Sequence, residues 1–199
     1  MATAKAKTST PRNEAPALGF LELSSISRGL YLTDVIVKKS PITVISSSPV
    51  SSGKHVILYF GEVAEVEEAH KAALEAAEDC LLKQILIPGV APELVPFLGA
   101  IGETAMGQPG PRDSVGIIES TNLSGAILSA DRALKTARIS LCRMRLGQGI
   151  GGKAYFVIRG AQEEVEAAVE SAKFCLAELE SLARVDVIPQ PQAEAVVHF

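Results

Sequence analysis

The sequence contains few of the residues on which most recognition and catalysis depend. It has no tryptophan, three histidines and three cysteines in 199 residues, and aromatic residues make up 5% of it. The formal net charge is -4, and the basic residues are scattered along the chain. Nucleic-acid binding uses a basic stripe and stacked aromatic side chains, so we expect no nucleic-acid partner.

Long apolar runs are also missing. No stretch approaches the roughly 18 consecutive apolar residues that predict a membrane-spanning helix, so we expect no membrane partner. Residues 1–17 are rich in alanine, threonine, lysine and proline and lack the apolar core of a secretory signal. We therefore predict a flexible tail over residues 1–17 and a protein that stays in the cytoplasm.

The cysteines and histidines show no catalytic or metal-binding spacing. They are Cys80, Cys142, Cys175, His55, His70 and His198. An odd number of cysteines without C-x-x-C spacing argues against a disulfide framework or a zinc site. No histidine has a sequence partner that suggests a triad, and His70 is expected on a packed helix face. We therefore expect no enzyme activity, no cofactor and no metal.

A glycine-dense loop, residues 147–153, matches G-x-G-x-x-G and the opening of the G-x-x-x-x-G-K-[ST] phosphate loop. Both motifs need a helix after the loop, because the first amides of that helix face the phosphates. Here the run Ala154-Tyr155-Phe156-Val157-Ile158 follows, which is typical of a β-strand. Ala154 also lacks the hydroxyl that would hold a magnesium ion. The loop is therefore predicted to join two strands.

An earlier loop ends in the same Gly-Lys pair and belongs to an internal repeat. Residues 18–23 return as residues 115–120 at an offset of 97, and after the loops the offset becomes 99. Matching pairs are Ser27 with Ser124, Asp34 with Asp131, Lys38 with Lys135, Gly53 with Gly152, Lys54 with Lys153 and Gly61 with Gly160. The chain is therefore predicted to be a tandem duplication of a unit of about 80 residues.

Hydrophobic periodicity gives the same order of elements in both units. Strands are predicted over residues 18–23, 42–45, 56–60 and 84–87, and over 115–120, 139–144, 155–159 and 184–188, with helices after the first and third strand of each unit. The order β-α-β-β-α-β predicts an α+β fold, a tandem duplication of the ferredoxin-like plan without circular permutation.

The predicted boundaries are a first domain over residues 18–98, a linker over 99–113, a second domain over 114–189 and a C-terminal tail over 190–199. A short helix is expected at residues 93–98, and the glycines and prolines of the linker predict no regular structure there. The first helix of each unit is expected to pack on its sheet through one apolar face. That face is Ile26, Leu30, Thr33 and Val37 in the first unit, and Leu123, Ile127, Ala130 and Leu134 in the second.

Two charged pairs recur at the same helical place. Asp34 and Lys38, like Asp131 and Lys135, lie four residues apart. They fit an i,i+4 ion pair, and because both copies keep them they fit an interface equally well.

These features together resemble the bacterial microcompartment shell proteins, and specifically their tandem-domain, trimer-forming class. The second unit carries the pattern most closely, in residues 115–120, residues 130–137, the glycine loop and residues 185–189. The likeness covers residues 18–189 with one linker. It implies a structural protein whose homotrimer forms a pseudohexagonal tile in a shell in the bacterial cytoplasm. Its partners would be other shell proteins, which form hexameric and pentameric tiles.

The resemblance also implies roles for single residues. Ser51, Ser52 and Gly53 would alternate with Gly149, Ile150 and Gly151 around a central pore for small polar metabolites, and Lys38 and Lys135 would lie at the tile edge. Neither loop has the cysteine that holds an iron–sulfur cluster in some relatives. Gln190 follows Pro189 where single-domain relatives often have arginine, and the unpermuted order favours a single-layer tile. The alternative is a regulatory protein that binds a small anion at its Gly-Lys loops.

Overall fold

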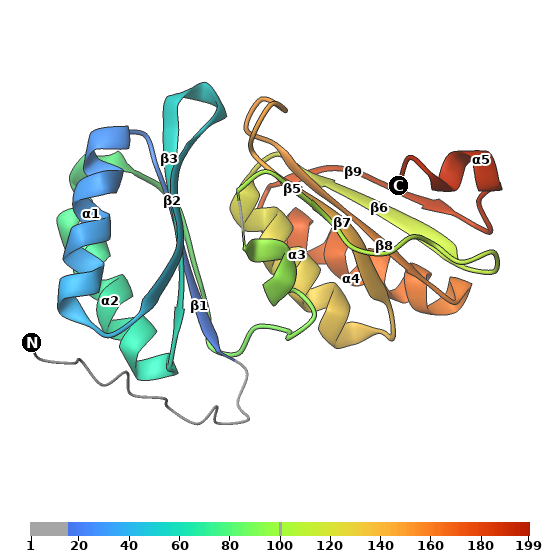
Figure 1. The fold of residues 1–199 in the computed structure, drawn as a ribbon, viewed down its shortest axis with the longest axis horizontal. Coiled ribbons are helices and arrows are strands. Elements are labelled where there is room, and N and C mark those ends of the chain that lie inside the picture. The colour runs from blue at the N-terminus through green and yellow to red at the C-terminus, as the bar shows by residue number, and fades with distance from the viewer. Residues whose placement is uncertain (1–15, 100) are drawn as a thin grey trace, which may run out of the picture.

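The structure, a computed structural model, describes residues 16–99 and 101–199. Residues 1–15, most of the predicted N-terminal tail, lie outside the described residues. Each repeat folds into a sheet of four antiparallel strands with two helices on one face, and a fifth strand joins the second sheet (Figure 1). The predicted α+β fold, with its duplicated β-α-β-β-α-β order, is confirmed.

Equivalent elements follow in the same order in both repeats. The first repeat has β1 (Ala17–Leu23), α1 (Ile26–Lys39), β2 (Thr43–Val50), β3 (Lys54–Gly61), α2 (Val63–Ala76) and β4 (Leu81–Ile87). The second has β6 (Ser114–Ser120), α3 (Leu123–Thr136), β7 (Ser140–Leu146), β8 (Ala154–Gly160), α4 (Gln162–Glu178) and β9 (Leu182–Ile188). The sheet orders are β2-β3-β1-β4 and β5-β7-β8-β6-β9, where β5 is Glu103–Ala105. No helix in the described part of the chain is long and apolar enough to cross a membrane.

Capping side chains fix where the first helix of each repeat begins. Ser25 Oγ accepts a hydrogen bond from Arg28 N at 3.2 Å and starts α1. Asn122 Oδ1 accepts one from Gly125 N at 2.8 Å and starts α3. Each cap satisfies an amide that has no partner inside the helix, so the two helices start at matching points of the repeat.

Sheets and helix pairs stack in alternating layers along the molecule (Figure 1). Side chains of the first sheet alternate between its two faces. Leu21 and Tyr59 are fully buried in the core that this sheet forms with its own helices. Leu18, Phe20 and Leu58 are fully buried in a core shared with the second repeat. The first sheet is thus covered on both faces, whereas the second sheet has α3 and α4 on one face and, among the described residues, only the C-terminal segment with Phe199 against the other (Figure 1).

The predicted packing face of α1 is wrong. Ile26, Leu30 and Val37 are 39%, 58% and 47% exposed, and α1 instead buries Leu32 and Ile36 against its own sheet. The equivalent face of α3 is buried, in the core that both repeats share. The physical reason is that each first helix carries two apolar faces: one packs on its own sheet, and the second is covered by the other repeat in α3 and left exposed in α1.

The segments after each repeat are more ordered than their composition predicts. In the linker, β5 pairs with the edge strand β7, which contradicts the expectation of no regular structure over residues 99–113. The edge of β7 offers unpaired backbone groups that such a segment can satisfy. A 3₁₀ turn at Val95–Leu98 lies where a short helix is expected, and the tail contains α5 (Ala193–Val196).

Candidate functional site

Two loops between strands lie side by side at one end of the two sheets (Figure 1). Residues 51–53 join β2 to β3, and residues 147–153 join β7 to β8. The amide of Gly149 donates a hydrogen bond to Ser51 Oγ at 3.1 Å. The glycine loop therefore lies between two strands, as predicted, and touches its counterpart from the other repeat.

The glycines of the longer loop serve its backbone geometry. Gly147, Gly149, Gly151 and Gly152 have φ values of 71°, 72°, 66° and 79°, in the left-handed region that favours glycine. In the shorter loop, Ser52 adopts φ 71° as a non-glycine residue. These sharp turns bring backbone amides and small side chains to the loop tips, which is how the predicted pore residues are presented.

The lysine that ends each loop is paired with a carboxylate. Lys54 Nζ lies 2.7 Å from Glu22 Oε1, and Lys153 Nζ lies 2.7 Å from Glu119 Oε1. The Glu22 side chain is 1% exposed, whereas that of Glu119 is 36% exposed. Both ammonium groups are thus neutralised by the protein itself, which does not favour the alternative of an anion held by the Gly-Lys loops. The same ion pair is buried in the first repeat and open in the second.

Arg145 contacts both the longer loop and the linker, and the sequence analysis does not predict this role. Its Nε donates to the Gln148 carbonyl oxygen at 3.3 Å, and its Nη1 lies 3.2 Å from Glu103 Oε2 in the linker strand. The Gly102 carbonyl also accepts from Leu146 N at 2.7 Å. The linker therefore holds the loop of the second repeat in place. Only the opposite charges of Glu103 and Arg145 hint at this contact in the sequence.

The charged pairs on the first helices occupy equivalent places in different surroundings. In α3, Asp131 Oδ1 accepts from Ala91 N at 2.7 Å, and Lys135 Nζ donates to the Gly89 carbonyl oxygen at 2.6 Å. Asp131 and Lys135 also pair with each other at 2.6 Å. In α1, Lys38 and Asp34 pair at 2.5 Å and stay 74% and 55% exposed. The i,i+4 ion pair is thus present in both repeats, and in the second repeat it also contacts the backbone at residues 89 and 91 of the same chain.

The charged pair of each helix lies on the same ridge as two apolar residues that precede it. The ridge at i, i+4, i+8 and i+12 consists of Leu123, Ile127, Asp131 and Lys135 in α3, and of Ile26, Leu30, Asp34 and Lys38 in α1. The two apolar members of the α3 ridge are fully buried, whereas those of the α1 ridge are 39% and 58% exposed. Side chains four residues apart lie on one face, so the α3 ridge faces the first repeat and the α1 ridge faces outward.

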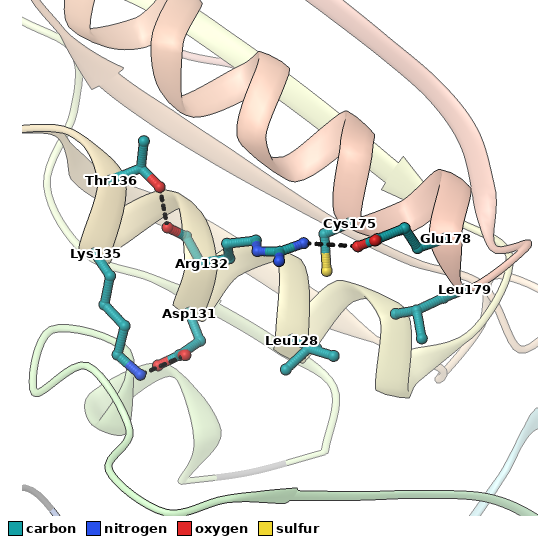
Figure 2. Close-up of a pocket in the computed structure, with 8 residues that line it drawn as sticks. All are labelled: Leu128, Asp131, Arg132, Lys135, Thr136, Cys175, Glu178 and Leu179. Carbon is teal, nitrogen blue, oxygen red and sulfur yellow. Dashed lines mark hydrogen bonds and ion pairs between the residues drawn. The ribbon is translucent and has the colours of Figure 1, made fainter.

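A groove of about 360 Å³ lies between α3 and α4 (Figure 2). It is lined by Leu128, Asp131, Arg132, Lys135, Thr136, Cys175, Glu178 and Leu179. Arg132 Nη1 pairs with Glu178 Oε2 at 2.9 Å across it. Burial raises the pKa of the Cys175 thiol above its usual value, so the sulfur is held as the unreactive thiol. Among the described residues, no group of three or more histidine, cysteine or acidic side chains is placed to hold a metal ion.

The fold and these sites define a class of protein, a duplicated module whose repeats associate through a helix ridge and a sheet face. The family model of the BMC domain matches this chain twice, over residues 17–90 and 114–191. The chain therefore belongs to the BMC-domain family and carries the domain in tandem.

Curated relatives and solved structures agree with this family. Bacterial microcompartment shell protein PduT of Citrobacter freundii is 30% identical over 175 residues, which cover 88% of this chain and 92% of that protein. Carboxysome assembly protein CcmO of Synechococcus elongatus is 25% identical over 92% of this chain and 68% of that protein. The crystal structure of a microcompartment protein from Desulfitobacterium hafniense DCB superposes with a TM-score of 0.80 at 29% identity, over 90% of this chain and 97% of that one. The predicted resemblance to tandem-domain shell proteins is confirmed, together with the structural role that it implies.

Proposed function

We propose that the chain is a shell tile of a bacterial microcompartment, in which three copies close into a ring of six domains. The observation that carries this proposal is the difference between the two helix ridges. The α3 ridge is buried between two repeats, whereas the equivalent α1 ridge exposes Leu30 at 58%. One chain thus has one occupied and one unoccupied copy of the same surface.

The surface that complements the free ridge is also present in the chain. The sheet of the first repeat receives α3 through residues that include Phe20 and Val56. Ile117 and Tyr155 are their equivalents on the second sheet, and both are only partly buried. A second copy that docks α1 there repeats the contact already made within the chain. A head-to-tail contact closes into a ring when the rotation between units divides a full turn, and closure after three chains requires a turn of about 60° per domain.

Ring closure would gather the loops at the centre of the tile. Because Ser51 already contacts Gly149, the same contact repeated three times would alternate the two loops around one opening. The proposed lining is Ser51, Ser52, Gly53, Gly149, Ile150 and Gly151. Hydroxyls, backbone amides and one modest apolar side chain suit the passage of small polar metabolites.

We assign Lys38 and Lys135 to the outer rim of the tile, where neighbouring hexameric, pentameric or trimeric tiles would meet it. Their side chains are 74% and 47% exposed, so both ammonium groups remain accessible. Lys135 is also tethered to Asp131 and to the Gly89 carbonyl, which fixes its direction. A positioned charge at a rim gives orientation and specificity between tiles more than raw affinity.

The purified protein should have a native mass of three times the 20.9 kDa chain mass. Analytical ultracentrifugation measures this mass, and negative-stain electron microscopy should show hexagonal outlines with a central depression. A chain that sediments as a monomer at micromolar concentration would refute the proposed function. Particles with a dimeric mass would equally exclude a six-domain ring.

Replacing the largest proposed pore residue should change permeation without changing assembly. The Ile150→Trp variant should slow release of a small polar product from shells that enclose an enzyme, because three indole rings would narrow one opening. Ile150→Ala serves as the widening control and should not slow release. Equal release rates for both variants and the wild type would show that residue 150 does not line the path.

A further inference from the structure

We infer that residues 190–199 form a clamp for helix α1 of the next copy in the ring. The clamp is a hydrogen bond from the backbone N–H of Gln192 to the carboxylate of Asp34. This inference rests on the proposed trimer and names a contact that holds it together. The evidence lies in how the corresponding segment of the first repeat, residues 89–98, holds helix α3 of its own chain.

The two segments are structural repeats of each other at an offset of 101 residues. Leu94 N donates to the Ala91 carbonyl oxygen at 2.9 Å, and Ala195 N donates to the Gln192 carbonyl oxygen at 2.9 Å. The next bond also recurs, from residue 97 to residue 94 and from residue 198 to residue 195, each at 3.0 Å. Residues 190–199 therefore belong to the second repeat and extend it beyond the boundary predicted at residue 189.

In the first repeat, this segment binds the α3 ridge directly. The Ala91 amide donates to Asp131 Oδ1 at 2.7 Å, and the Asp131 carboxylate is 6% exposed. Val90, Leu94 and Leu98 are fully buried in the core that α3 shares with the first sheet. The segment is thus one wall of the site in which α3 lies, and the buried hydrogen bond from Ala91 N to Asp131 lies at its start.

Residues 190–199 have an equivalent backbone donor and an equivalent apolar residue, but no helix in the described part of the single chain lies against them. Gln192, the equivalent of Ala91, is exposed, and its amide has no acceptor among the described residues. Phe199, the equivalent of Leu98, packs on the second sheet beside Cys142 and Val157. This wall therefore stands next to the free sheet face that would receive α1.

The α1 side also offers the matching acceptor. Asp34 lies 97 residues before Asp131, and within the described part of the chain Lys38 is its one partner, at 2.5 Å. Superposing the contact of the first repeat on the second therefore brings the Asp34 carboxylate of one copy to the Gln192 amide of the next. In the first repeat the Gly89 carbonyl oxygen accepts from Lys135, the equivalent of Lys38. Gln190, the equivalent of Gly89, has φ 45°, so the backbone differs at this point. We therefore place the clamp on Asp34 and not on Lys38.

Position 192 permits a test that removes one donor and little else. Gln192 has φ -65°, the value to which a proline ring locks the backbone, so Gln192→Pro deletes the N–H without changing the local angle. Gln192→Ala, which keeps the N–H, is the matched control. The trimer dissociation constant is measured by sedimentation equilibrium for the wild type, these two variants, Asp34→Ala and the Asp34→Ala/Gln192→Pro double variant.

The clamp predicts that Asp34→Ala and Gln192→Pro each weaken every interface by about tenfold to a hundredfold, the range for a hydrogen bond to a charged group. The double variant should be no weaker than either single variant, and Gln192→Ala should match the wild type. A wild-type trimer with additive effects, or with no effect of Gln192→Pro, would overturn the clamp and leave the ring standing. A monomeric wild type would instead refute the proposed function itself.

Discussion

The Leu30→Asp variant should be a folded monomer, whereas Ile127→Asp should unfold the chain or separate its repeats. The two residues are equivalents at an offset of 97, and they are 58% and 0% exposed. At Leu30 the new carboxylate meets water in the single chain, so its stability should change by no more than about 0.5 kcal/mol. At residue 127 the carboxylate is buried without a partner, which should cost more than about 4 kcal/mol.

Sedimentation and thermal unfolding separate these effects. For Leu30→Asp, the mass should fall to 20.9 kDa while the circular dichroism spectrum stays that of the wild type. Leu30→Ala is the control, and it should weaken the trimer less because it adds no charge to the interface. A Leu30→Asp protein that remains trimeric would show that the α1 ridge is not the contact between copies.

The strand and helix order follows from sequence because it depends on local patterns that occur twice. Alternating apolar residues and short turns define each strand, and the second repeat checks the first. The partner of each helix does not follow from such patterns. Ile26 and Leu30 have helical spacing that fits any apolar sheet, and only the structure shows that their equivalents in α3 lie against the other repeat. Periodicity gives a face but not what covers it.

The sequence likewise predicts some features of the candidate site and not others. The glycine loop is correctly predicted to join two strands because the residues that follow it have strong β propensity. The linker strand β5 is three residues long and lies among glycines, so no sequence pattern reveals it. In the terminal segments, Glu93 and Val95 recur as Glu194 and Val196, which is too short a match to see. Their repetition appears in backbone hydrogen bonds, to which the sequence gives no direct access.

The first repeat differs from the second in holding two buried histidines. His70 Nδ1 accepts from the Tyr59 hydroxyl at 2.6 Å, and its Nε2 donates to Gln84 Oε1 at 2.5 Å. His55 Nε2 bonds to Ser47 Oγ at 2.8 Å, and its Nδ1 is buried without a partner. At His55 a second ring proton on Nδ1 would find no acceptor, which suits a neutral imidazole. At His70 the Gln84 carbonyl oxygen and the Tyr59 hydroxyl suit a ring with one donor and one acceptor nitrogen. Burial lowers the pKa of both histidines, and at His70 the bond to Gln84 opposes this shift in part.

Stability should therefore fall as the pH drops below about 6.5, the pKa of histidine in the unfolded chain. Above that pH, both states are neutral and the full stability is present. Below it, the unfolded chain binds protons that the folded chain excludes, so the free energy of unfolding should decrease by up to about 1.4 kcal/mol per pH unit for each histidine. The decrease ends once the pH passes below the lowered pKa values of the folded state.

Thermal unfolding between about pH 7.5 and pH 5.5 measures this slope, and the second repeat supplies the control. The second repeat has Ala154 in place of His55, Val169 in place of His70 and Ile158 in place of Tyr59. The triple variant His55→Ala/His70→Val/Tyr59→Phe therefore takes the two residues of the second repeat at the histidine positions. Phenylalanine at position 59 removes the hydroxyl that would otherwise lose its acceptor. The variant should be less stable at neutral pH yet nearly flat over this interval, since most carboxylates titrate below it. The slope, not the absolute stability, decides the matter, and a wild type as flat as the variant would contradict the buried neutral histidines. Because both histidines lie in the first repeat, acid should loosen the half of each chain that carries the α1 ridge.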